Sequence, residues 1–476
     1  MDGPVPELQS RADACAERLL AAEEVLLVSH IDADGLTSAA IAASALERAK
    51  VPFEAGFANQ LDADELDRIA ATDYDTVLLT DFGSGQLDLV ADHEAAGDFT
   101  PIVADHHQPA DADTEYHLNP LLEGIDGASE LSGAGAAYVL ARAMVAADAE
   151  AGDDVANRDL AALAVVGAVG DMQASGGELV GANAAIVAEG EEAGVLETGT
   201  DLALYGKQTR PLPKLLEYAS DVYVPGVSND EAGALRFLDG LDLDLQADGD
   251  WRRWVDLDDD ERRTVASALV QRAVERGVPA DKIDGLVGTT YTLAEEPKGT
   301  ELRDASEFST LLNATARYER ADVGLAVCLG NRDGALDRAR NLLREHRRNL
   351  SAGIERVEQE GVTRAEHVQW FHAGDRIRET IVGIVAGMAL GSDGVDRNRP
   401  IVAFAEKDDE SIKVSARGTH GLVRRGLDLS VAMHEAAVAV DGEGGGHDVA
   451  AGATIPRGTE ETFVDRVDDL VGEQLG

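Results

Sequence analysis

Residues 24–35 of the chain read EVLLVSHIDADG, an apolar run that ends in one histidine and two aspartates. The run from Glu24 to Ile31 predicts a buried β-strand, because short apolar runs of this kind are typical of strands in a parallel sheet. His30, Asp32 and Asp34 stand at alternate positions. In extended backbone this spacing points the three side chains to one side, where they can converge on a cation. Taken alone, the stretch also fits a turn with capping aspartates.

Two other predicted strands end in similar side chains. Thr76 to Asp81 ends in LLTDFG, and Pro101 to Asp105 ends in IVADHH, where His106 and His107 follow. A further acid, Asp171, closes the apolar helix LAVVGAVGD. Because ligands bind at the carboxyl ends of strands in an open parallel sheet, we expect these groups to meet.

The residue types at these positions are those of a transition-metal site. Carboxylates mixed with imidazoles suit Mn²⁺, Zn²⁺ or Fe²⁺, and so many carboxylates favour two ions over one. Singly, Asp81 also fits a helix cap and Asp171 a solvated helix end. Adjacent histidines such as His106 and His107 are seldom required by structure alone. The groups together, each at the end of a predicted element, predict a dinuclear site.

The length of 476 residues exceeds what one hydrophobic core supports, so we expect two or three domains. Residues 1–195 alternate apolar runs with Ala-rich helical patterns and predict a parallel α/β sheet. Residues 196–345 are less regular and predict an inserted domain. A charged helix from Asp337 to about Glu360 should link it to residues 346–476, a smaller α/β domain; the arginines of this helix fit either a solvated face or a strand-guiding patch. In that last domain we expect strand His367–Phe371, helix Ile377–Leu390, strands Pro400–Glu406 and Ser411–Ala416, helix Leu429–Val440 and then a glycine loop.

The C-terminal domain contains two motifs suited to phosphate. The sequence SARG ends a predicted strand, and GGGHDVAAG runs from Gly444 to Gly452. Three glycines before a helix would let backbone N–H groups approach a phosphate, and the helix N-terminus would add partial positive charge. Singly, the glycines also fit a flexible turn, and the arginine also fits an ion pair with a carboxylate. The candidate phosphate ligands are Ser415, Arg417, Gly445, Gly446 and His447.

The composition is strongly acidic: 41 Lys and Arg stand against 90 Asp and Glu, which gives a net charge of −49. A hydrophobic content of 44% argues against disorder, so the charge belongs to the surface. An acidic surface with few lysines indicates a halophilic archaeon with a cytosol of molar salt, where a Debye length of roughly 3 Å screens carboxylate repulsion. The charge counts against a nucleic-acid partner at low salt. In molar salt, binding would rest on metal–phosphate contacts, hydrogen bonds and stacking.

The two cysteines, Cys15 and Cys328, lie far apart in sequence and predict neither a disulfide framework nor a metal site. The N-terminus lacks a secretory pattern, and no uninterrupted apolar run reaches about 18 residues. We therefore expect a soluble, cytoplasmic protein without a membrane partner.

The motifs HIDADG, TDFG, ADHH, GD, SARG and GGGHDVAAG, in this order, resemble the DHH phosphoesterase superfamily with its DHH-associated C-terminal domain. Within it, the chain is most similar to the archaeal RecJ-like single-strand exonucleases, including the nuclease that associates with the GINS complex. The segments LPKLLEYASDVYVPGV and LRDASEFSTLLNATARY resemble those proteins too, so the likeness covers nearly the whole chain. It implies an α/β fold with a parallel-sheet DHH catalytic domain, a middle inserted domain and a smaller DHH-associated domain that binds substrate.

The resemblance also implies a role for each candidate residue. Asp81 would bridge two divalent cations, Mn²⁺ by preference or Mg²⁺, while Asp105 would orient His106 and His107 would face the scissile phosphate. Ser415 and Arg417, with the Gly445, Gly446 and His447 loop, would hold the substrate phosphate. One ion would be held by His30, Asp32 and Asp81, and the other by Asp34, Asp81, His106 and Asp171.

The expected reaction is hydrolysis of single-stranded DNA or RNA from an end, in replication or repair. Two ions about 3.5–4 Å apart would supply hydroxide near neutral pH, so no separate side-chain base is needed. A cleft between the catalytic and C-terminal domains should admit one strand and exclude a duplex. The family implies 5′ to 3′ polarity, although some archaeal relatives resemble 3′ to 5′ enzymes.

Two other functions remain open at this stage. One is a phosphodiesterase for small substrates, such as oligoribonucleotides, cyclic dinucleotides or a nucleotide bisphosphate. The other is a subunit of the replicative helicase assembly, with GINS and MCM as partners. The complete set of candidate ligands argues against lost catalysis in such a subunit but not against membership of the assembly.

Overall fold

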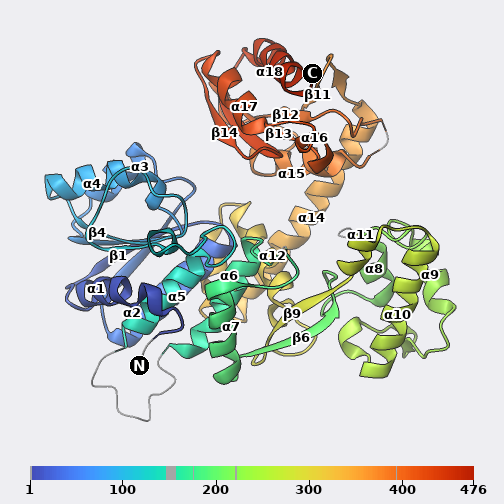
Figure 1. Cartoon of the computed structure of the whole chain (residues 1–476), viewed down its shortest axis with the longest axis horizontal. Helices are drawn as coiled ribbons and strands as arrows, with labels where there is room; N and C mark the ends of the chain where they lie inside the picture. The colour runs from blue at the N-terminus through green and yellow to red at the C-terminus, as the bar shows by residue number, and fades with distance from the viewer. Residues whose placement is uncertain (1–2, 146–156, 175, 220–221, 393) are drawn as a thin grey trace. The chain divides into compact units, whose positions relative to one another are not determined.

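The computed structural model describes residues 3–145, 157–174, 176–219, 222–392 and 394–476 (Figure 1). The chain forms two compact units, Met1–Arg340 and Asn341–Gly476. The α/β class expected from the sequence is confirmed in both.

A five-stranded sheet, parallel throughout, forms the centre of the first unit. Its strand order is β2-β1-β3-β4-β5. The three strands predicted from the sequence are confirmed to within one residue at each end, and β2 and β5 were not predicted. The strand bounds are β1 Val25–His30, β2 Phe53–Ala58, β3 Thr76–Thr80, β4 Thr100–Ala104 and β5 His117–Leu118.

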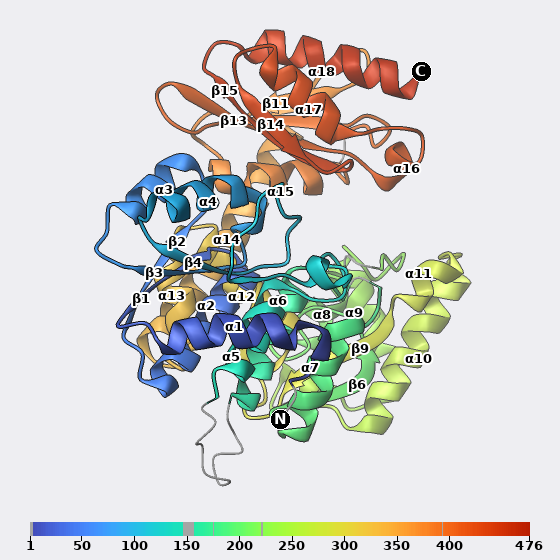
Figure 2. The same cartoon turned by 60° about the vertical axis from the view of Figure 1, so that its left-hand side comes forward.

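Helices cover both faces of this sheet, and Figure 2 shows α3 and α4 on one side with α1, α2 and α5 on the other. Along β1 the side chains alternate between the two layers: Leu27 packs with the α1, α2 and α5 residues, and Val28 packs with those of α3 and α4. Burial on both faces explains why β1 is apolar at successive positions rather than at every second one. These helices are α1 Gln9–Leu20, α2 Ala33–Ala49, α3 Ala63–Ala70, α4 Leu87–Ala96 and α5 Gly133–Ala143.

A buried ion-pair cluster joins α5 to α7 (Gly181–Glu192) and to the 3₁₀ turn Arg158–Leu160, which precedes α6 (Ala161–Gly170). Glu189 accepts hydrogen bonds from Tyr138 Oη at 2.6 Å, from Arg142 Nη2 at 2.9 Å and from Arg158 Nε at 3.1 Å. The side chains of Arg142 and Glu189 are each only 9% exposed. Removing this carboxylate would delete the buried acceptor that these three donors share, and breaking a buried ion pair is costly.

Glu189→Ala should therefore lower the free energy of unfolding by about 3 kcal/mol. Denaturant titration followed by circular dichroism would measure it. Glu192→Ala is the matched control, because Glu192 lies one turn away, is 71% exposed and contacts Arg158 only at 3.6 Å. Equal, small decreases in the free energy of unfolding of both variants would show that the cluster contributes little to stability.

The middle region, residues 196–293, begins and ends in an antiparallel ribbon of β6 and β9. Leu196 pairs with Leu293 at one end of the ribbon, and Leu202 pairs with Val287 at the other. Four helices and a short hairpin lie between these strands, around a core that includes Trp254. The elements are β6 Leu196–Leu202, α8 Leu212–Glu217, α9 Glu231–Asp239, β7 Gln246–Ala247, β8 Asp250–Trp251, α10 Asp259–Glu275, α11 Ala280–Asp284 and β9 Val287–Leu293.

After β9 the chain returns to the first sheet through α12 (Ala305–Ala316) and α13 (Ala321–Cys328), which pack against α2 and α6. Asn313 of α12 accepts a hydrogen bond from the backbone N–H of Ala33 at 3.1 Å. Part of the stretch expected to belong to the inserted domain therefore supports the helix that follows β1.

The second unit contains a six-stranded sheet of order β10-β11-β12-β13-β15-β14. Within the described residues of this unit, β11 and β12 pair in parallel and the other neighbours pair antiparallel. The strands and helices expected from residues 367–440 are present, with ends that differ by up to two residues. The predicted charged helix is α14, and the boundary between the two units along the chain falls within it. The elements are α14 Gly334–Glu360, β10 Thr363–Arg364, β11 Gln369–His372, α15 Glu379–Ala389, β12 Ile401–Glu406, β13 Ser411–Arg417, α16 His420–Val423, α17 Leu429–Val438, β14 Glu443–Gly446, β15 Ala450–Pro456 and α18 Glu460–Leu475.

The glycine run does not precede a helix, so that part of the expectation is wrong. Gly444, Gly445 and Gly446 form β14, which pairs antiparallel with β15 and turns at His447. The absence of side chains serves packing here, because a Cβ on Gly444 would lie 2.6 Å from the carbonyl oxygen of Met433 in α17. A close strand–helix contact and a phosphate loop give the same sequence pattern.

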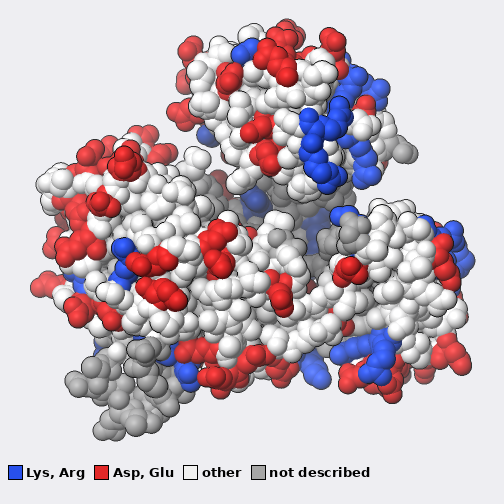
Figure 3. Space-filling view, viewed as in Figure 1, with Lys and Arg blue, Asp and Glu red and all other residues white. Residues whose placement is uncertain are grey.

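Carboxylates are spread over the visible surface of both units, whereas lysine and arginine gather in a few places (Figure 3). Among the described residues, no helix has a stretch long and apolar enough to span a bilayer.

Candidate metal centre

The candidate site lies where β1, β3 and β4 end. His30 is the last residue of β1, Asp81 follows β3, and Asp105 and His106 follow β4. Because these strands are parallel neighbours, their carboxyl ends lie at the same edge of the sheet. The fold therefore brings together residues that are up to 76 positions apart in the sequence.

Asp32 and Asp34 do not continue the strand as expected, because α2 begins between them at Ala33. Asp32 is the N-cap, and its Oδ1 accepts a hydrogen bond from Gly35 N at 3.0 Å. Asp34 lies in the first helical turn, fully buried. The alternating, one-sided geometry is thus wrong for Asp34, which reaches the site from a helix.

The carboxylate of Asp34 is fixed by the N-terminus of α5. Its Oδ2 accepts a hydrogen bond from Gly133 N at 2.7 Å, and its Oδ1 accepts one from Ala134 N at 3.0 Å. Unpaired N–H groups and the helix dipole both favour a negative charge at this position.

One group of possible ligands comprises His30, Asp32 and Asp81, which offer ligand atoms within 4.8 Å of one another. His30 Nδ1 lies 3.3 Å from Asp32 Oδ1 and 3.6 Å from Asp81 Oδ2. These are the three residues predicted for one ion.

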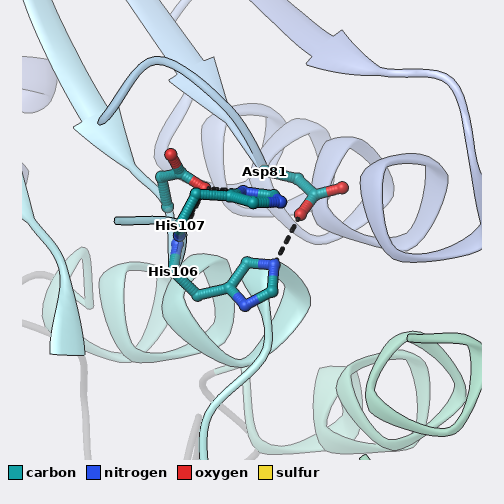
Figure 4. A group of neighbouring side chains, drawn as sticks. Asp81, His106 and His107 are labelled. Atoms are coloured by element: carbon teal, nitrogen blue, oxygen red, sulfur yellow. Dashed lines mark hydrogen bonds and ion pairs between the residues drawn. The ribbon is translucent and has the colours of Figure 1, made fainter. Parts of the chain in front are cut away.

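A second group comprises Asp34, His106 and Asp171, and it also meets the 4.8 Å limit. His106 Nε2 lies 3.8 Å from Asp34 Oδ2 and 3.3 Å from Asp81 Oδ1, and His106 Nδ1 lies 3.9 Å from Asp171 Oδ2. Figure 4 shows the His106 ring directed at Asp81. Asp81 therefore has one oxygen near each group, as a bridging ligand requires.

The ring of His106 is oriented by a backbone carbonyl and not by Asp105, which corrects the predicted role. Nδ1 of His106 lies 2.7 Å from the carbonyl oxygen of Gly127. As a carbonyl only accepts, Nδ1 carries the proton, and in the neutral ring Nε2 keeps its lone pair toward the site.

Asp105 instead holds the other histidine. Its Oδ1 lies 2.8 Å from His107 Nδ1 and accepts a hydrogen bond from the His106 backbone N–H at 2.7 Å, while its Oδ2 accepts one from Ser84 N at 2.9 Å. The hydrogen bond to Asp105 raises the pKa of His107, whose side chain is 56% exposed. His107 is thus a held, partly exposed proton donor beside the buried acids.

The shifted pKa values of the site reflect its concentrated negative charge. Burial, and then the charges of Asp81 and Asp171, raise the pKa of Asp34 well above its ordinary value; burial also raises the pKa of Asp171. Burial opposes protonation of His30, but the carboxylates of Asp32 and Asp81 outweigh it and raise its pKa to about 10. Protons taken up by these groups would offset part of the carboxylate charge, and a bound divalent cation would do the same.

Asp81 gives the sharpest test of whether these residues fit metal ions. It is 2% exposed, and among the described residues no donor makes a hydrogen bond to its Oδ1. Its near polar neighbour is His106 Nε2 at 3.3 Å, which carries no proton in the neutral ring, and a buried carboxylate oxygen that receives no hydrogen bond is costly. A divalent cation would supply the partner, and the imidazole and carboxylate donors around it are those that Mn²⁺ prefers.

Sequence reasoning missed the residues that shape the site without binding a metal. A Cβ on Gly133 would lie 2.8 Å from Asp81 Cγ, and one on Gly167 would lie within 3.0 Å of Asp34 Oδ1. Gln173 donates hydrogen bonds to Asp171 Oδ2 and to the Gly127 carbonyl oxygen, both at 2.9 Å. The glycines at 127, 133 and 167 were visible in the sequence, but nothing local connects them to the acids.

The candidate phosphate ligands lie in the second unit and are described there alone. Ser415 and Arg417 alternate on β13, and Ser415 and Gly445 both pair with Gly452 of β15. Arg417 Nη1 donates to the carbonyl oxygen of Ala416 at 2.8 Å, and His447 is exposed in the adjoining turn. The expected residues therefore share one region of that sheet; their contact with phosphate stays a prediction.

Fold and site together define an α/β protein with buried acids and imidazoles, arranged for divalent cations, at the carboxyl edge of a parallel sheet. Three domain families match in order: the DHH family N-terminal domain over residues 24–168, the DHH-CID domain over 204–287 and the DHHA1 domain over 367–473. The chain belongs to the DHH superfamily, whose DHH family comprises metal-dependent phosphoesterases.

Similar proteins share this organisation along nearly the whole chain. An uncharacterized protein of Methanocaldococcus jannaschii is 29% identical over 461 residues, which cover 95% of this chain and 94% of that one. RecJ of Thermus thermophilus, solved in complex with Mn²⁺, has a TM-score of 0.61 at 18% identity and covers 99% of this chain, which spans 56% of the RecJ chain. CDC45 of Entamoeba histolytica has a TM-score of 0.60 at 12% identity over 98% of this chain and 97% of that one. At these identities the two structures establish a common fold.

Proposed function

We propose that this protein is a metal-dependent phosphodiesterase that hydrolyses single-stranded nucleic acid from an end. The observation that carries the proposal is Asp81, a buried carboxylate with an oxygen near each of two ligand groups and no hydrogen-bond donor for Oδ1. Membership of the DHH superfamily and the fold shared with RecJ support the same reading.

In this proposal each side chain has a role that follows from its environment. His30 and Asp32 would hold one divalent cation, Asp34, His106 and Asp171 would hold the other, and Asp81 would contribute to both. Bound there, two such ions, Mn²⁺ by preference, would activate water for attack and stabilise charge on the phosphoryl group. His107, protonated and held by Asp105, donates a hydrogen bond to the phosphate oxygens from the exposed side of the site. Ser415, Arg417 and the Gly445 to His447 turn hold substrate phosphate in the second unit.

Digestion of end-labelled single-stranded DNA and RNA in molar KCl with Mn²⁺ tests the proposal directly. We expect stepwise shortening from one end, weak cleavage of duplex, and far slower turnover of a dinucleotide than of a strand of about 30 nucleotides. Asp105→Ala should abolish cleavage because it releases His107. Efficient hydrolysis of dinucleotides alone would instead make the chain a small-substrate phosphodiesterase.

A second candidate function is that of a subunit in a replicative helicase assembly. The observation in its favour is the fold shared with CDC45 over almost the full length of both chains. GINS and the MCM helicase would be the partners, and co-purification in native salt would detect them. Gel filtration of native extract that shows the chain alone would count against this role.

Manganese binding should strengthen as the pH rises from about 6 to about 8, with release of protons. The sign follows from the metal-free site, where the pKa values of His30, His106 and Asp34 are raised, so that protons compete with the cation. Calorimetry in two buffers of different protonation enthalpy would count these protons and should give two ions per chain. A pH-independent affinity without proton release would contradict the assigned ligands.

A further inference from the structure

A cavity of about 640 Å³ opens beside the candidate metal centre, within the first unit. One wall is formed by His30, Asp81, Asp105 and His107, all of them residues of the site. The volume lies within the range of about 300–1,000 Å³ that is usual for small-molecule sites. Any group bound to a phosphate at the metal centre would have this space within reach.

The remaining walls of the cavity are formed by the ends of β2 and β3 and by α3 and α4. Phe82, Leu61 and Leu89 supply apolar surface. The other lining side chains are mainly carboxamides, and neither lysine nor arginine is among them. The carboxamides are Asn59, Gln60, Gln86 and Gln108.

This chemistry selects the kind of occupant. A second phosphate group would meet neither lysine nor arginine here, and the two histidines of the wall are already engaged at the metal centre, which disfavours it. A neutral, flat heteroaromatic ring fits, because it can stack on an aromatic face and meet polar groups at its edge. Carboxamides both donate and accept hydrogen bonds, so they can match the edges of different bases.

We propose that this cavity is the subsite for the nucleobase adjoining the cleaved phosphodiester bond. The inference rests on the proposed function and names the part of the substrate that the first unit recognises. Recognition by rotatable carboxamides and an apolar surface tolerates any base but requires that one be present. The subsite thus ties cleavage to an intact nucleotide while leaving the sequence free.

The subsite can be filled without touching the metal ligands. Ala63 lines the cavity, is exposed and opens α3, so Ala63→Trp would place an indole in the space for the base. Asp64→Trp is the matched control: Asp64 is the next residue of the same helical turn, is also exposed, and does not line the cavity.

Binding is measured with a single strand carrying 2-aminopurine at its terminal nucleotide, with Ca²⁺ replacing Mn²⁺ to observe binding without turnover. We expect a fluorescence change on binding, its loss together with an approximately tenfold weaker affinity in Ala63→Trp, and neither effect in Asp64→Trp. A strand with an abasic terminal nucleotide should bind about tenfold more weakly to the unaltered protein and equally to both variants.

The outcomes separate this inference from the nuclease assignment. Cleavage of the abasic strand with an unchanged KM, or an Ala63→Trp variant that binds like Asp64→Trp, overturns the subsite while the nuclease assignment stands. Base-dependent fluorescence without cleavage of any strand under Mn²⁺ supports the subsite and overturns the nuclease assignment. Neither binding nor cleavage overturns both.

Discussion

Asp81→Asn should lower kcat for strand cleavage by about 10³-fold, equivalent to about 4 kcal/mol of transition-state stabilisation. The amide keeps the shape of the side chain but removes the charge that two cations would share. Asparagine is also the replacement that best preserves the backbone, because Asp81 has a φ of 60°, in the left-handed region that asparagine tolerates. Single-turnover cleavage and Mn²⁺ calorimetry on the same preparation would measure both effects.

Asp88→Asn provides the control for this substitution, because Asp88 is an exposed carboxylate in the first turn of α4. It should cleave and bind Mn²⁺ like the unaltered protein. An Asp81→Asn variant that cleaves normally and still binds two ions would refute the bridging role. Loss of cleavage with two ions still bound would show that Asp81 acts on the substrate and is not needed to bind the ions.

Gly133→Ala should lower kcat by about 10²-fold while leaving the fold intact, equivalent to about 3 kcal/mol. The added Cβ would lie 2.8 Å from both Cβ and Cγ of Asp81, so the carboxylate must move. Gly133 is the first residue of α5, and alanine is a better helix former than glycine, so the helix itself should not suffer. The expected defect is weaker Mn²⁺ binding with an unchanged circular dichroism spectrum.

Gly56→Ala serves as the control for Gly133→Ala, since a Cβ at Gly56 in the same sheet would meet only the Leu27 carbonyl oxygen, at 4.0 Å. It should bind Mn²⁺ and cleave normally. If Gly133→Ala behaved in the same way, Asp81 would have room to move without loss of function. The proposal that Asp81 must be held in one position to bridge the ions would then be wrong.

The central strands were predictable because strands buried on both faces contain runs of consecutive apolar residues. β1, β3 and β4 are covered on both faces and are therefore apolar at successive positions, while the ligand-type residues stand at or just after their ends. β2 escaped prediction because it lies at the sheet edge, is only partly buried and carries glycine at position 56. β5 has only two residues, too few for any periodicity.

The candidate site was predictable in its members but not in its geometry. The identities of His30, Asp32 and Asp34 pointed to a cation, but the extended backbone expected through Asp34 was wrong, because the helix already starts at Ala33. The partner of the His106 ring is the backbone carbonyl of Gly127. Every residue type has a backbone carbonyl, so the sequence does not indicate which one accepts this hydrogen bond. The glycines at β14 were misread because a close packing contact and a phosphate-binding turn make the same demand on side-chain size.

Because of the β6–β9 ribbon, the middle region can be removed from the chain as one piece. At the far end of the ribbon Leu202 pairs with Val287, and the next residue, Ala203, donates a backbone hydrogen bond to Leu286 at 2.9 Å. The intervening segment thus begins and ends at adjacent points of the β6–β9 ribbon. A tight turn joining residues 202 and 287 would excise it and keep α12 and α13 in place, whereas truncation at residue 195 would strip α2 and α6 of both helices.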